Sequence, residues 1–207
     1  MQAMKGITII IPTMWYFPKQ LQKMVRKYDA IDEIKEILII NNRGVREIDI
    51  PLKKVRVLGT GHNMFVNPAW NLGAKEAKTE KIIIANDDIV IEEVEKVINI
   101  MKWLIIPLTI VGLHSSSYEK ETTSRGVNFP KAMEHGFGVF MGLYKTSYVE
   151  VPKEFKVWYG DNIQFINNDP VTISGFKVAT NMRGTSRRLN LNKERVSELA
   201  AWKNYNK

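Results

Sequence analysis

Three adjacent polar residues, Asn86, Asp87 and Asp88, interrupt the otherwise apolar stretch KIIIANDDIV at 81–90. Two ionised carboxylates at the edge of a core repel each other and lose hydration, which is costly unless a positive charge compensates. A divalent cation held by one or two carboxylates can bridge to phosphate oxygens, which indicates a nucleotide–metal site. The same residue types also favour a turn or the cap of a following helix, and the sequence leaves both interpretations open.

Cysteine and histidine add little to the chemistry that this sequence can support. With no cysteine in 207 residues, disulfides and thiolate reactions are excluded, and a metal would have to be held by oxygen or imidazole. The three histidines, His62, His114 and His135, are too far apart for a zinc-binding spacing. The glycines of VLGTGHN at 57–63 follow neither the dinucleotide nor the P-loop spacing.

The elements that must position the acidic pair follow an alternating pattern. Apolar segments typical of strands occur at 6–13, 36–42, 53–59, 81–88 and 108–114, and amphipathic segments typical of helices occur at 17–28, 67–80 and 92–105. Asn67 is the expected cap of the second helix, because a proline follows it. This alternation predicts an α/β fold with a mostly parallel sheet covered by helices on both faces.

Polar side chains follow the strands of this predicted sheet. Ligands bind such sheets at the carboxyl ends of the strands, where this sequence has Thr13, Asn41, Asn42, Asn86, Asp87 and Asp88. We expect these residues to share one cleft.

The second half of the chain has a different character. Loops rich in Ser, Thr and Gly follow residue 114, with a mobile segment expected at 115–130, one or two strands at 135–149 and a final helix at 192–207. The length and the 44% hydrophobic content fit one compact domain. The formal net charge of +8 favours polyanionic partners, although a basic tail can also be an ordinary solvated surface.

Several segments together resemble the GT-A glycosyltransferases, in particular small family-2-like enzymes of viruses and bacteriophages. The nucleotide-binding half of that family is similar to ITIIIPT, EILIINN, NPAWNLGAKEA and KIIIANDDIVI, and its acceptor side is similar to HGFGVFMGLYKTSY and WYGDNIQF. The resemblance implies a GT-A, Rossmann-like sheet with a smaller acceptor-side β segment. It divides a single domain, 1–207, into a nucleotide-sugar-binding half (1–113), an acceptor half (114–180) and a basic tail with a helix (181–207).

The resemblance also implies residues that bind the donor. In that family the backbone after the first strand holds uracil and ribose, which corresponds here to Pro12, Thr13, Met14 and Trp15. Asn41 and Asn42 replace an acidic residue that contacts the base, and an amide can still hydrogen-bond a uracil edge. The segment that packs beside the nucleotide and sugar contains Asn67, Trp70 and Asn71. A UDP-sugar is the implied donor.

The metal motif of the family, Asp-any-Asp, falls on Asn86, Asp87 and Asp88. The resemblance implies Mn²⁺ or Mg²⁺, with Asp88 as the ligand and Asp87 in contact with sugar or ribose, and with an amide at the first position. Many relatives add a late histidine to the metal shell, and NMRGTSRR at 181–188 has none. Arg183, Ser186 or Arg187 would contact the diphosphate instead.

Asp161 matches the carboxylate that removes a proton from the attacking hydroxyl in inverting members of the family. Asp after Gly also favours a helix cap, so two interpretations of Asp161 remain. The adjacent Trp158 and Tyr159 could stack on a sugar or a nucleobase, or could belong to the core.

The acceptor and the cell compartment follow less directly. The basic charge and the viral resemblance favour a hydroxymethylated pyrimidine in phage DNA, with a glycan or a protein side chain as the rival acceptor. A nucleotidyltransferase would need a glycine-rich loop with a lysine, which IPTMWYFPK lacks, while Asn86 would suit a catalytically inactive DNA-binding module. No apolar run is long enough to span a membrane, so we expect a soluble protein of the cytoplasm, the host cytoplasm for a viral enzyme.

Overall fold

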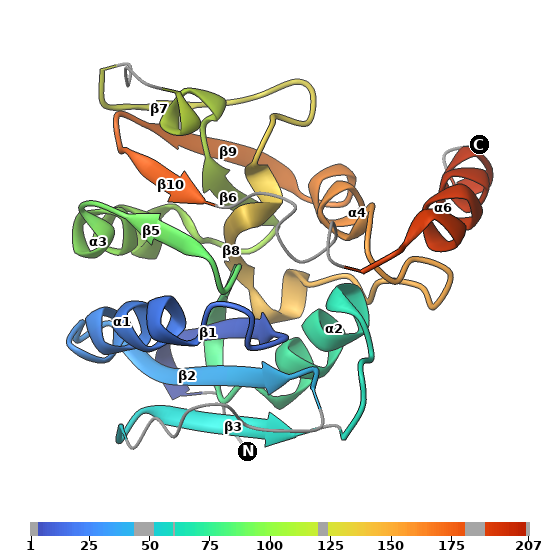
Figure 1. The fold of residues 1–207 in the computed structure, drawn as a ribbon. Coiled ribbons are helices and arrows are strands. Elements are labelled where there is room, and N and C mark those ends of the chain that lie inside the picture. Colours follow the sequence, from blue (N-terminus) through green and yellow to red (C-terminus); the bar gives the residue numbers. More distant parts are fainter. Residues whose placement is uncertain (1–3, 44–51, 60, 120–123, 181–188, 206–207) are drawn as a thin grey trace.

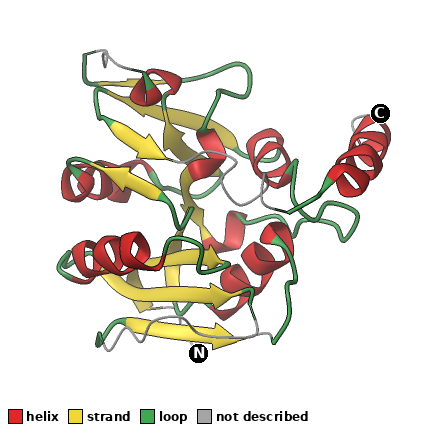
Figure 2. Ribbon diagram, in the orientation of Figure 1, coloured by secondary structure: helices red, strands yellow, loops and turns green. Residues whose placement is uncertain are grey.

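The computed structural model describes residues 4–43, 52–59, 61–119, 124–180 and 189–205. The strands are β1 (Met4–Thr13), β2 (Ile34–Asn41), β3 (Val55–Gly59), β4 (Thr79–Ala85), β5 (Ile89–Ile91), β6 (Thr109–Leu113), β7 (Gly126–Asn128), β8 (Phe140–Tyr144), β9 (Asp169–Ser174) and β10 (Val178–Thr180). The helices are α1 (Pro18–Asp29), α2 (Val66–Glu76), α3 (Val94–Leu104), α4 (Gly160–Ile166) and α6 (Asn192–Tyr205), with short 3-10 turns η1 (Ser115–Tyr118), η2 (Phe137–Val139) and η3 (Lys145–Ser147) (Figures 1 and 2). None of these described helices has the length and apolar character that a bilayer crossing requires.

The strands form a mixed sheet of eight in the order β3-β2-β1-β4-β8-β6-β9-β7, beside a small sheet of β5 and β10. Strands β1 to β4 are parallel to one another, as are β6 and β9, whereas β8 runs antiparallel between β4 and β6. The predicted α/β class is therefore confirmed. The reversal at β8 pairs Phe140 with Ala85, so the segment before β8 reaches the edge where β1, β2 and β4 end.

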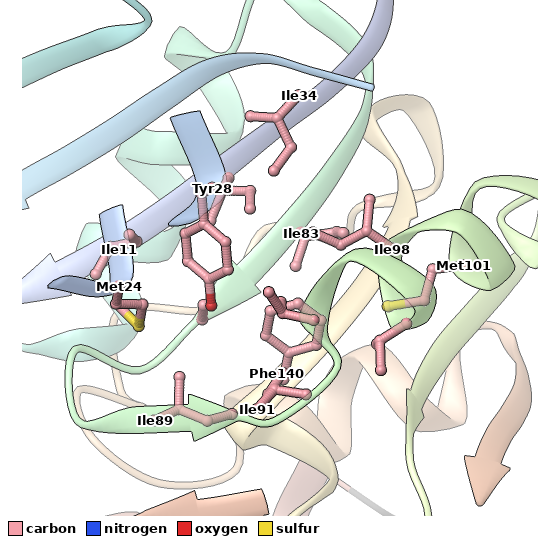
Figure 3. Packing of buried hydrophobic residues seen from close by; sticks show 14 of the residues in the cluster. Ile11, Met24, Tyr28, Ile34, Ile83, Ile89, Ile91, Ile98, Met101 and Phe140 are labelled. Carbon is pink, nitrogen blue, oxygen red and sulfur yellow. The ribbon is translucent and has the colours of Figure 1, made fainter. Parts of the chain in front are cut away.

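Helices cover both faces of the large sheet, which explains why its strands are apolar throughout. On β1, Ile9 belongs to one buried cluster and Ile10 to the other, and neither side chain is exposed. Helices α1 and α3 pack on the first face, where the Tyr28 and Phe140 rings lie among isoleucines (Figure 3). Helices α2 and α4 contribute Trp70 and Phe165 to the second face.

Several boundaries differ from the sequence prediction. Helix α2 begins at Val66, and Asn67 lies inside its first turn without capping it. The Asn67 amide instead donates hydrogen bonds to the carbonyls of Phe155 and Trp158, because the loop before α4 crosses this end of α2. The strand predicted at 81–88 ends at Ala85, and the segment expected to be a mobile loop at 115–130 contains η1 and β7.

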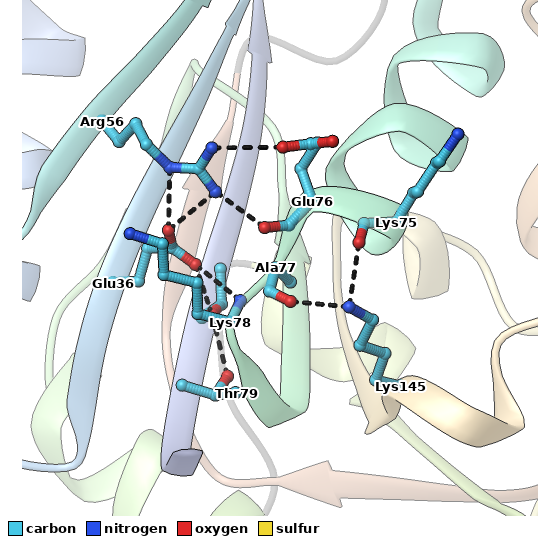
Figure 4. A network of polar contacts seen from close by, with 9 residues as sticks. Glu36, Arg56, Lys75, Glu76, Ala77, Lys78, Thr79 and Lys145 are labelled. Atoms are coloured by element: carbon cyan, nitrogen blue, oxygen red, sulfur yellow. Dashed lines mark hydrogen bonds and ion pairs between the residues drawn. The ribbon is translucent and has the colours of Figure 1, made fainter. Parts of the chain in front are cut away.

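A buried polar network joins β1, β2 and β4 at the edge opposite the strand ends (Figure 4). The Glu36 carboxylate accepts hydrogen bonds from the Thr8 hydroxyl at 3.0 Å and the Lys78 N–H at 2.9 Å, and it pairs with Arg56 at 3.0 Å. Glu36 is only 4% exposed and Thr8 is fully buried, so water cannot take the place of this carboxylate at the Thr8 hydroxyl. The second partner of Arg56, Glu76, is far more accessible.

We expect Glu36→Ala to lower the free energy of unfolding by about 3 kcal/mol, because it removes the buried acceptor of the Thr8 hydroxyl and the Lys78 N–H and leaves Arg56 with only its more accessible partner, Glu76. Glu76→Ala is the matched control, since it removes the exposed partner of the same guanidinium and should cost less than about 1 kcal/mol. Urea unfolding of both variants measures the difference. Equal losses would contradict the central role of Glu36.

Candidate functional site

A cleft of about 1120 Å³ opens where β1, β2 and β4 end. Its described lining includes these residues that the sequence predicted for the site: Pro12, Thr13, Met14, Asn42, Trp70, Asn86, Asp87, Asp88 and Asp161. The strand ends supply one wall, and the start of α4 with the segment before β8 supplies another. The predicted convergence of polar strand ends on one cleft therefore matches the structure for five of six residues, with Asn41 the exception.

The acidic pair lies in the turn between β4 and β5, where side chains from distant segments hold it. The Thr13 hydroxyl donates to one carboxylate oxygen of Asp87 at 2.6 Å and accepts from the N–H of Trp15 at 2.9 Å. On the other side, the Thr180 hydroxyl donates to the Asp88 carboxylate at 3.2 Å, and Gln20 donates to the Asp88 carbonyl at 2.6 Å. The strand ends and the β5–β10 sheet thus fix both carboxylates in orientation.

Burial makes it costly for both carboxylates of the acidic pair to be ionised. Asp87 and Asp88 are 7% and 6% exposed. Burial raises the pKa of Asp87 to about 6, and the neighbouring charge of Asp88 adds to this effect. Within the described residues, no three His, Asp or Glu side chains gather around a point, so the chain offers a cation two carboxylates rather than a complete cage. This donor set fits Mg²⁺ or Mn²⁺, which commonly bind one or two carboxylates together with substrate phosphates.

Asp161 reaches the cleft from the first turn of α4. Tyr159, just before the helix, adopts a left-handed backbone conformation with φ 65°, which turns the chain sharply into Gly160. A Cβ on Gly138 would come within 2.5 Å of the Asp161 carboxylate, so only glycine fits opposite it. Burial raises the pKa of Asp161 above its ordinary value, and the backbone N–H of Asn162, 3.0 Å from one carboxylate oxygen, opposes this only in part.

Asn42 and Phe65 shape the part of the cleft beside β2. Phe65 has φ 69° and ψ 176°, a conformation that costs a residue other than glycine about 1 to 3 kcal/mol. The side chains of Asn63 and Asn42 hold it, since Asn63 accepts the Phe65 N–H at 2.8 Å and Asn42 donates to the Phe65 carbonyl at 3.1 Å. Among the described residues, the carbonyl oxygen of the Asn42 side chain and the indole N–H of Trp70 are both buried without a hydrogen-bond partner.

Four residues that the sequence assigned to the donor do not line the cleft. Trp15 is 2% exposed, and its indole donates to Asn41 at 2.8 Å, so these two side chains hold each other. Asn67 is fully buried against the loop before α4. Asn71 bonds Val151 and Tyr148. All four are better explained as supports for the cleft walls. Arg183 and Arg187 lie outside the described residues.

The structure brings further residues to the cleft that the sequence did not assign. Gly136 and Gly138 come from the segment before β8, and Leu189–Asn192 with Arg195 come from the segment that leads into α6 and from its first turn. Among the described lining residues, Arg195 is the single lysine or arginine. The sequence marked its segment only as a helix, because nothing local indicates that α6 packs against a distant cleft.

No protein-family model matches the sequence, and no curated protein matches it. Several solved structures, however, resemble this chain in fold. GalNAc-T7, crystallised with UDP, GalNAc and Mn²⁺, matches with a TM-score of 0.61 and 12% identity over 84% of this chain. The S. aureus TarS 1–349 complex with UDP gives 0.59 and 14% over 84%, and the mannosyltransferase PcManGT from Pyrobaculum calidifontis, with GDP-Man and Mn²⁺, gives 0.57 and 15% over 80%.

These neighbours are GT-A glycosyltransferases. The chain has the GT-A fold. It spans 43% of the GalNAc-T7 chain, 59% of the TarS chain and 54% of the PcManGT chain. The GT-A part of the predicted resemblance is thus confirmed, and the viral or bacteriophage type stays a prediction.

The raised pKa of Asp161 predicts a cost to stability. Because folding raises this pKa, the folded protein holds the proton more tightly, and stability falls as the pH rises from the ordinary carboxylate range through the raised pKa. The free energy of unfolding of Asp161→Asn should therefore equal that of the wild type at about pH 4 and exceed it at neutral pH. Urea unfolding without nucleotide or metal measures both. Asp169→Asn, at an exposed carboxylate, is the control. A variant less stable than wild type at neutral pH would contradict this.

Proposed function

We propose that the chain is a metal-dependent glycosyltransferase that moves a sugar from a nucleotide-sugar to an acceptor hydroxyl. The observation that carries the proposal is the buried pair Asp87 and Asp88 at the end of β4, in a cleft that also contains Asp161, on a GT-A fold. Neighbours of the same fold have been crystallised with UDP or GDP-Man, two of them with Mn²⁺. Together these support a donor with a diphosphate that a cation must neutralise.

The acidic pair serves the donor side. A Mn²⁺ or Mg²⁺ ion held by Asp88 would neutralise charge on the diphosphate leaving group. Thr13 occupies one oxygen of Asp87, and the other is proposed to contact the sugar or ribose. Asn86, whose N–H donates to the Val139 carbonyl at 3.0 Å, fixes the turn that holds both acids.

The nucleoside is proposed to bind between Pro12, Thr13, Met14 and Asn42. Asn42 lines this part of the cleft, and its side chain is proposed to hydrogen-bond the edge of uracil, with a UDP-sugar as the donor. Trp70 contributes its indole face to the neighbouring wall. Arg195 is proposed as a contact for negative charge, in addition to Arg183 and Arg187, which lie outside the described residues.

Asp161 is proposed as the general base of an inverting transfer. It would accept the proton of the acceptor hydroxyl as that oxygen bonds the anomeric carbon and the bond to the diphosphate breaks. Of the described lining residues, Asp161 is the single carboxylate apart from the metal pair. Its raised pKa makes it a stronger base than an exposed aspartate.

Two variants should separate the donor and acceptor roles. Asp88→Ala should abolish Mn²⁺-dependent binding of UDP, measured by isothermal titration, because it removes the proposed ligand. Asp161→Asn should bind UDP as the wild type does and lose about 100-fold or more in sugar-nucleotide turnover, because the base is gone. Unchanged UDP affinity in the first variant, or retained turnover in the second, would overturn the corresponding role.

The acceptor is proposed to be a hydroxymethylated pyrimidine in DNA, with a glycan or protein hydroxyl as the alternative. The net charge of +8 supports the first, because polyanion binding releases counterions. Transfer to DNA should then fall steeply between about 50 and 200 mM salt, while turnover on free sugars stays constant. Transfer that is indifferent to salt, or that occurs only on glycans, would favour the alternative.

A further inference from the structure

Helix α6 extends away from the sheet beside α4 (Figure 1). It lies beyond the segments that resemble the glycosyltransferases, and much of its surface is exposed, including Val196 at 72% and Leu199 at 45%. The side chain of Glu198, by contrast, is buried. Glu198 is 1% exposed, which is unusual for a carboxylate on an otherwise solvated helix.

Glu198 binds the backbone of the loop before α4. One carboxylate oxygen, Oε2, accepts the N–H of Trp158 at 2.8 Å and lies 3.3 Å from the N–H of Val157. The other, Oε1, accepts the Val157 N–H at 3.1 Å. Both N–H groups belong to residues that line the cleft, three and four positions before Asp161. The carboxylate therefore fixes the backbone that leads directly into the proposed base.

Aromatic rings from α6 hold the next residue of the same loop. Trp202 stacks on Tyr159 with ring centroids 4.8 Å apart and an angle of 14° between the planes. Phe155 closes this cluster with an edge contact to Trp202 at 6.1 Å. Tyr159 is the residue with the left-handed backbone that turns the chain into Gly160 and Asp161. Contacts from α6 thus span the loop from its start to the turn before the base.

The same helix also forms part of the cleft. Arg195 lies one turn before Glu198, hence on the same side of α6, and it lines the cleft together with Leu191 and Asn192. The face of α6 that holds the loop is therefore continuous with the face that borders the reacting groups.

We propose that Glu198 is a positioning residue that acts through the Val157 and Trp158 backbone to hold Asp161 in place, which makes α6 part of the acceptor side of the site. This inference rests on the proposed function. The role depends on hydrogen-bond acceptance rather than on charge, because Oε2 alone is within reach of both N–H groups. A glutamine carbonyl in that position keeps the bond from Trp158, although its NH2 group then faces the Val157 N–H, whereas alanine leaves two buried donors unpaired.

The test compares Glu198→Gln and Glu198→Ala with Glu194→Ala, which removes a carboxylate one turn earlier on the same helix. UDP binding with Mn²⁺ reports the donor side, and hydrolysis of UDP-sugars with water as acceptor reports the reacting groups, so no acceptor need be known. Glu198→Ala should lower the hydrolysis kcat by about 100-fold, since a base displaced by about 1 Å loses that much, with UDP affinity unchanged. Glu194→Ala should remain close to the wild type in both measurements, and Glu198→Gln should lose much less hydrolysis than Glu198→Ala, with UDP affinity unchanged.

Three results would overturn the inference: wild-type hydrolysis in Glu198→Ala, an equal loss of UDP affinity and turnover in that variant, or a Glu198→Gln variant as impaired as Glu198→Ala. Trp202→Ala repeats the test through the ring stacked on Tyr159 and serves if Glu198→Ala does not fold. A wild-type chain that neither binds UDP nor hydrolyses any UDP-sugar overturns the proposed function and this inference with it. Normal wild-type hydrolysis combined with any of the three results overturns the inference alone.

Discussion

The site depends on two carboxylates held out of water at the end of a buried strand. Asp87 and Asp88 are both less than a tenth exposed, and burial raises the pKa of Asp87. Keeping these carboxylates ionised in a buried position lowers the stability of the folded protein. Hydroxyls from β1 and β10, those of Thr13 and Thr180, orient the pair. A position that accumulates negative charge where it is poorly solvated favours a cation with its phosphate partner more strongly than an exposed pair would.

The two ends of the sheet are built in different ways. At the edge away from the cleft, Glu36 pairs with Arg56 and accepts bonds from Thr8 and Lys78, so the polar groups of the network satisfy one another. At the cleft, by contrast, no described residue hydrogen-bonds the carbonyl of the Asn42 side chain or the Trp70 indole N–H. Unpaired buried groups are costly, and these two line the same cleft as Phe65, whose backbone is also strained.

The part of the cleft around Asp161 is built by packing between segments that are distant in sequence. Gly138 leaves room for the Asp161 carboxylate, and Gly160 fits against Asn67 and Trp70 of α2, where a Cβ would come within 2.3 Å. Helix α6 then closes the loop from outside through Glu198 and Trp202. Asp161 therefore owes its position to three separate elements.

The sequence by itself determined the alternation of strands and helices, the α/β class and the clustering of Thr13, Asn42, Asp87 and Asp88, because hydrophobic period and strand-end polarity are local signals. It could not separate Asn42, which lines the cleft, from Asn41, which bonds Trp15, since adjacent residues on a strand differ only in the face they meet. Only the tertiary structure decided that β8 reverses the sheet, that Asn67 supports a loop instead of capping α2, and that Arg195 and Glu198 reach the site. Each of these depends on contacts between segments many residues apart, which no local pattern encodes.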